Sequence, residues 1–151
     1  MKRTDELWYD HEVLRSKLAL LEEYLPVRSY GLYTVTRLTD ALAESLRSHV
    51  EREERMFAHL APHGETELAG PIQHAHDDHD NERIRLAVLH GLLTRPEPVS
   101  DEQVTIQASY LIQDVRDHMA REEAELFPVI EMRETFEVQE SNDTVEMLGL
   151  A

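Results

Sequence analysis

Four stretches of this chain carry apolar residues at alternating steps of three and four, and in each stretch a histidine interrupts the apolar line. Residues at these steps share one face of an α-helix. Clusters of proline and glycine separate the stretches at residues 26, 62–70 and 94–98. The pattern therefore predicts four helices, which cover residues 4–25, 30–61, 71–93 and 100–134.

Local signals support the ends of two of these helices. Pro71 suits the first position of a helix, and Ser100 with Gln103 has the spacing of a capping box. Pro128 is expected to kink the last turns of the fourth helix. Short connections between long helices favour antiparallel neighbours, so the sequence predicts an all-α, up-down-up-down four-helix bundle over residues 1–134.

Residues 135–151 are acidic and irregular, and no period extends through them. They are expected to form a short flexible tail. The apolar residues near its end leave a second interpretation open, in which the tail docks on the bundle or binds a protein partner.

The charge of the chain argues against a nucleic-acid partner. Lys and Arg total 15 and Asp and Glu total 31, and the resulting net charge of −16 repels phosphate backbones. Cysteine is absent, so a metal site must use nitrogen and oxygen donors. The charged N-terminal residues and the lack of a long apolar run predict a cytoplasmic protein with no membrane association.

A short motif, His-x-x-x-Glu-Glu, occurs in the second stretch and again in the fourth. It joins His49 to Glu53 and His118 to Glu122. Residues four apart lie on one side of a helix with Cβ atoms roughly 5–6 Å apart, so each pair can reach a common ion. The second glutamate of each motif turns toward a different face.

These polar residues interrupt apolar lines, which places them in the predicted core. A buried carboxylate costs several kcal/mol unless it is paired or bound to a metal. The nearby arginines project mainly toward other faces, so metal ions are the better counter-charge, and His11 and His79 lie on the inward lines of the remaining helices. Mixed imidazole and carboxylate donors suit several divalent metals, zinc and manganese among them, and a hydrogen-bonded network without any ion also stays open.

These residues resemble the motifs of the hemerythrin family, in particular its bacterial His-His-Glu cation-binding domains, over about residues 5–132. The resemblance is carried by Asp10-His11, His49-x-x-x-Glu53-Glu54, Asp78-His79-x-x-x-Arg83 and His118-x-x-x-Glu122-Glu123-x-x-Leu126-Phe127-Pro128.

The resemblance implies a non-haem centre of two iron ions with an oxo or hydroxo bridge. By the same resemblance, the terminal ligands are His11, His49, His79 and His118, and the bridging ligands are Glu53 and Glu122. Hemerythrins that carry oxygen reversibly have a His-x-x-x-His pair in the third helix and an Asp in the fourth, whereas this chain has Ala75 and Glu122 there. His76 or a tyrosine is left open as a further ligand.

A site of this kind predicts a protein that binds or senses a small molecule, namely O₂, NO or peroxide, or that binds iron itself. A second interpretation is a di-iron enzyme that decomposes peroxide or repairs nitrosative or oxidative damage. A third is a partner-binding module that responds to iron through the tail. The sequence does not choose among these ligands.

Overall fold

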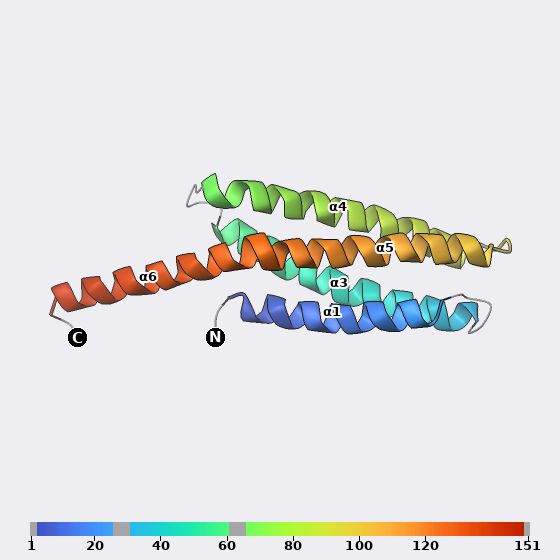
Figure 1. The fold of residues 1–151 in the computed structure, drawn as a ribbon, viewed down its shortest axis with the longest axis horizontal. Coiled ribbons are helices and arrows are strands. Elements are labelled where there is room, and N and C mark those ends of the chain that lie inside the picture. The colour runs from blue at the N-terminus through green and yellow to red at the C-terminus, as the bar shows by residue number, and fades with distance from the viewer. Residues whose placement is uncertain (1–2, 26–30, 61–65, 150–151) are drawn as a thin grey trace.

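The structure is a computed structural model that describes residues 3–25, 31–60 and 66–149. Its helices run alternately in opposite directions along a common axis, as Figure 1 shows. In chain order they are α1 (Asp5–Glu23), α3 (Leu32–Leu60), α4 (Thr66–Thr94), α5 (Asp101–Arg121), the π-helical turn η2 (Glu122–Leu126) and α6 (Phe127–Met147). The predicted up-down-up-down four-helix bundle is confirmed.

The helices associate as two close pairs. α1 packs most extensively on α3, and α4 packs most extensively on α5. The contacts between the pairs, α3 with α4 and α1 with α5, are less extensive. Among the described residues, no helix combines the length and the apolar character that crossing a membrane requires.

Two apolar clusters fill the bundle, one on each side of a layer of buried histidine and glutamate side chains. This polar layer consists of His11, His49, Glu53, His79, His118 and Glu122. The larger cluster is built mainly from leucine and valine, and includes Leu14, Leu18, Leu42, Leu89, Leu111 and Val115. The smaller cluster includes Leu7, Met56, Phe57, Leu126, Phe127 and Ile130. Each fully buried side chain of this size stabilises the fold by about 1.5–3 kcal/mol. The clusters therefore supply the stability that holds a polar layer between them.

The third helix begins earlier than predicted. α4 starts at Thr66, so Pro71 lies inside the helix rather than at its first position. A proline near a helix start removes one backbone hydrogen bond without ending the helix. The earlier start brings His49 and His79 to similar positions along the bundle axis. His79 lies 13 residues after Thr66, where α4 begins, and His49 lies 11 residues before Leu60, where α3 ends.

The irregularity predicted at Pro128 takes the form of the π-helical turn η2. The Phe127 N–H donates to the carbonyl of Glu122, five residues back. The two His-x-x-x-Glu-Glu motifs differ here by one residue, since Phe57 follows Glu53 by four positions and Phe127 follows Glu122 by five. The π turn absorbs the extra residue, and Figure 1 shows that α6 leaves at an angle to α5.

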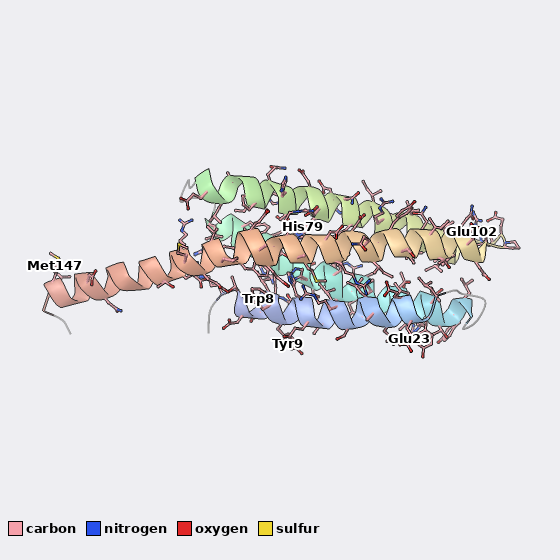
Figure 2. The ribbon with its side chains drawn as sticks, viewed as in Figure 1. Trp8, Tyr9, Glu23, His79, Glu102 and Met147 are labelled. Atoms are coloured by element: carbon pink, nitrogen blue, oxygen red, sulfur yellow. The ribbon has the colours of Figure 1, made fainter. Side chains whose placement is uncertain are left out.

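The prediction that the last helix ends near residue 134 is wrong, because α6 continues to Met147. Extending a helix that is already formed costs little free energy, since each added residue gains one hydrogen bond without a new nucleation step. Gly149, at a φ of 66°, follows its end. Thr4 and Trp8 anchor the base of α6 by donating hydrogen bonds of 2.7 and 2.9 Å to Glu131. The far end projects beyond the bundle, where Figure 2 labels Met147.

Candidate metal centre

The structure brings all the predicted ligand residues together in the polar layer. Each helix of the bundle contributes at least one of them, and Figure 2 labels His79 about midway along the bundle. All are buried, with exposed fractions of 0% for His11, 1% for His49, 0% for Glu53, 4% for His79, 1% for His118 and 3% for Glu122.

The layer contains two groups of donor atoms that share two carboxylates. Glu53 and Glu122 lie with His11 and His49 in one group and with His79 and His118 in the other. Within each group the donor atoms all lie within 4.8 Å of one another. Two histidines therefore flank the shared carboxylates on each side.

The carboxylate oxygens face the histidine Nε2 atoms. Oε1 of Glu122 lies 3.2 Å from Nε2 of His11 and 3.1 Å from Nε2 of His118. Oε1 of Glu53 contacts Nε2 of His49, while Oε2 of the same side chain lies 3.8 Å from Nε2 of His79. Each carboxylate thus reaches histidines of both groups, as a bridging ligand must.

When no metal is bound, contacts within the layer shift the pKa values of its histidines. Burial alone lowers the pKa of His49, but the hydrogen bond that it donates to Asp10 and its close contacts with Glu122 and Glu53 outweigh burial and raise the pKa to about 11. The pKa of His118 rises to about 11 through Glu122 and Glu82 against the same effect of burial. Without metal, both imidazoles therefore carry a proton on each nitrogen and are positively charged at neutral pH.

The two central carboxylates shift in opposite directions. Burial and the neighbouring Glu122 raise the pKa of Glu53 well above its ordinary value. Burial also acts to raise the pKa of Glu122, but its close contacts with Glu53 and with His11, His118 and His49 hold the pKa well below its ordinary value. Without metal, Glu53 therefore takes up a proton at a higher pH than Glu122 does.

Several buried donor atoms in the layer lack a hydrogen bond of adequate geometry, although ion-pair contacts approach some of them. They are both carboxylate oxygens of Glu53, Oε2 of Glu122, and Nε2 of His79 and of His118. A buried polar atom without a partner calls for an explanation such as a bound ion. A hydrogen-bonded network alone leaves these atoms unsatisfied, so the donor set fits a cation better than it fits an ion-free core.

A second set of carboxylates fixes the histidine rings. Each ring turns its Nδ1 toward a carboxylate from another helix, at 2.6 Å for His11 to Glu123, 3.0 Å for His49 to Asp10, 2.7 Å for His79 to Glu54 and 2.5 Å for His118 to Glu82. A carboxylate at Nδ1 holds a proton there and makes Nε2 the nitrogen that binds a metal. All four rings are therefore oriented toward the layer.

Sequence reasoning missed these orienting roles. It placed Glu54 and Glu123 away from the centre without a function, and it did not single out Glu82, which is 2% exposed. The available signal was spacing, because Glu82 follows His79 by three residues and shares its helix face. Asp10 was noted only as part of a motif, and its role depends on α3 packing against α1.

The structure separates the further ligand candidates. His76 directs Nδ1 to Glu54 at 2.9 Å and lies outside the two central groups. Tyr9, Tyr33 and Tyr110 are exposed by 67%, 77% and 49%, so these phenols do not enter the layer. Tyr30 lies outside the described residues.

A groove of about 790 Å³ between α3 and α4 reaches the polar layer. His79 and Glu82 lie at the layer, and apolar walls come from Leu46, Val50 and Leu86. The groove occupies one of the two less extensive helix contacts of the bundle. The groove opens to solvent along one side, while His79 and Glu82 at its inner end stay buried.

Comparison with known proteins places this arrangement in a family. The family model of the hemerythrin HHE cation-binding domain matches residues 2–130. No curated protein and no solved structure matches the chain. The match covers most of the 151 residues and includes every member of the polar layer. The chain belongs to the hemerythrin family, as an HHE cation-binding domain.

Proposed function

We propose that the polar layer holds a non-haem di-iron centre. His11 and His49 bind one iron, His79 and His118 bind the other, and both carboxylates bridge. The observation that carries this proposal is that Glu53 and Glu122 belong to both groups of donor atoms. The bundle over residues 1–134 supplies every ligand of the proposed centre.

The donor chemistry favours iron. Imidazole and carboxylate together suit iron, while the absence of cysteine removes the thiolates typical of structural zinc sites. The orienting carboxylates at Nδ1 make the imidazoles more basic, which strengthens binding of a charged metal. Zinc and manganese are the competing ions.

Bound iron would supply open coordination positions at which O₂, NO or peroxide binds. The protein orients the histidines, neutralises the metal charge with two carboxylates and surrounds the centre with apolar side chains. Ferritin-like di-iron proteins use four carboxylates. Because this donor set is less anionic, we propose reversible binding or sensing of the small molecule as the function.

The size of the α3/α4 groove favours a second candidate function. At about 790 Å³ it is larger than a diatomic molecule requires, and it reaches His79. An enzyme that decomposes peroxide or repairs nitrosative or oxidative damage would use such an opening. Release of oxygen on addition of peroxide to the iron-loaded protein would favour this candidate over a binding protein.

Metal analysis of protein expressed in iron-rich medium tests the centre. We expect about two irons per chain, and a visible band that forms with O₂ or NO and disappears when the gas is removed. An iron content near zero in protein that is folded by circular dichroism contradicts the di-iron centre. A metal content made up of zinc or manganese contradicts the choice of iron.

The Glu82→Gln variant tests the orienting carboxylates. Glutamine keeps the shape of the side chain but bonds less strongly to the Nδ1 proton of His118. We expect metal affinity to fall by about 10–100-fold, as is typical when such a partner is lost. Competition with a chelator measures the affinity, with exposed Glu67→Gln on the same helix as the matched control. Equal affinity in both variants would contradict the orienting role.

A further inference from the structure

We propose that Glu54, His76 and His79 form a peripheral metal site through which divalent iron enters the bundle. The inference rests on the proposed function, since it assigns a route by which that centre is filled. It adds Glu54 and His76, which the di-iron centre does not use, to His79, which both groups share.

The three side chains converge from two helices. Oε1 of Glu54 on α3 lies 2.9 Å from Nδ1 of His76 and 2.7 Å from Nδ1 of His79, both on α4. The donor atoms all lie within 4.8 Å of one another. The two histidines are three residues apart, so they project from the same side of their helix.

This donor set suits Fe²⁺. Two imidazoles and one carboxylate with open positions form the arrangement that non-haem Fe²⁺ sites use. The side chains of Glu54 and His76 are each 39% exposed, so solvent water can occupy the remaining positions. A hydrated ion can therefore bind here before it loses all of its water.

His79 connects this group with the centre. Its side chain is 2% exposed, and its two nitrogens face opposite ways. Nδ1 faces Glu54 at 2.7 Å, and Nε2 lies 3.8 Å from Oε2 of Glu53. One ring thus separates a solvent-facing group of ligands from the buried one.

Phe57 holds both imidazoles in place. Its ring centroid lies 5.5 Å from that of His76 in an edge-on contact and 6.4 Å from that of His79 in a stacked contact. Phe57 is 3% exposed, so the wall that it forms is fixed by the core. The two donors are therefore oriented before an ion arrives.

The other orienting carboxylates do not offer a comparable entrance. Arg15 binds Glu123 at 2.7 Å, and Arg52 binds Asp10 at 2.8 Å. A guanidinium at these positions repels a cation. Glu82 is itself buried. Glu54, in contrast, is contacted by imidazoles, which become metal ligands when they are neutral.

Transfer to the centre requires the ring of His79 to change tautomer. In the peripheral site Nδ1 binds the ion and Nε2 carries the proton. In the centre Nε2 binds the ion and Nδ1 carries the proton, which it donates to Glu54. The Nε2 proton is released to water, and Nδ1 takes up a proton from water beside the part-exposed Glu54, so the ring stays neutral and the protons balance.

The test is the rate of anaerobic Fe²⁺ uptake by the metal-free full chain, measured by rapid desalting and metal analysis. His76→Gln removes a ligand, yet its amide can still donate to Glu54 and hold it in place. We expect uptake at least about tenfold slower than in the wild type, the scale of effect typical for a group at the edge of a metal site. The final iron content should be unchanged.

His74→Gln is the matched control, because His74 is exposed on the same helix two residues away. It should load at the wild-type rate, and His76→Asp, which restores a ligand, should load faster than His76→Gln. Equal rates in the wild type and His76→Gln would overturn the entry site while leaving the centre intact. A wild type that takes up no iron would instead contradict the di-iron centre.

Discussion

Replacing Glu53 by glutamine is expected to abolish metal-dependent stabilisation while leaving the metal-free bundle at least as stable as the wild type. The raised pKa of Glu53 favours the neutral, protonated carboxyl in the metal-free fold. Glutamine has the same shape and is also neutral, so the metal-free core loses little. It cannot supply the anionic bridge, however, and the positive charge of two ions then lacks half of its compensation.

Thermal unfolding with and without Fe²⁺ under anaerobic conditions measures the effect. A ligand at 100 times its Kd stabilises the wild type by about 2.7 kcal/mol. That gain corresponds to a Tm shift of roughly 5–10 °C for a domain of this size. We expect no shift for Glu53→Gln. The matched control is Glu125→Gln, an exposed residue in the π turn, which should keep the wild-type shift. A full shift in Glu53→Gln would contradict the bridging role.

The second large effect is proton release on metal binding. His49 and His118 have pKa values of about 11 in the metal-free fold, against an ordinary value of 6.5. Both are therefore protonated at neutral pH, and a metal must displace those protons. We expect at least two protons per chain to be released. The overall binding constant for both ions should rise at least about 100-fold per pH unit as the pH increases toward 11.

The same shifts give the sign of the stability change. A histidine whose pKa is raised on folding stabilises the metal-free fold fully below pH 6.5, and this contribution is lost as the pH rises toward about 11. The metal-free and metal-bound forms should therefore diverge in Tm as the pH increases.

A pH indicator in weak buffer measures the protons that metal binding releases, with Glu53→Gln as the control that releases none. Uptake without proton release would contradict the assignment of His49 and His118.

Sequence periodicity was sufficient to predict the bundle and to bring the central residues together. The inward positions of His49 and Glu53 follow from steps of three and four along one helix, which local geometry fixes before any tertiary contact forms. Residues far apart in the chain, such as His11 and His118, meet because each lies on the inward face of its own helix. That deduction requires the number of helices and the inward-facing side of each, and the sequence pattern predicts both.

Helix boundaries were less predictable. Pro71 reads as a helix start, yet the packing of Leu68 in the smaller apolar cluster stabilises a turn that precedes it. The last helix reads as ending near residue 134, although a formed helix continues to Met147. In both cases the local signal competes with the low cost of extending a helix that is already held by the bundle.

The sequence by itself determined the fold, the family and the residues of the polar layer, because these depend on periodicity and on the presence of charge at apolar positions. Only the tertiary structure decided which carboxylate orients which histidine, that Phe127 after the π turn packs on His11 as Phe57 packs on His79, and that His76 joins Glu54 at the surface. The physical reason is that these contacts join different helices. Their partners depend on helix rotation and axial offset, which differ by fractions of a turn that no single-helix pattern encodes.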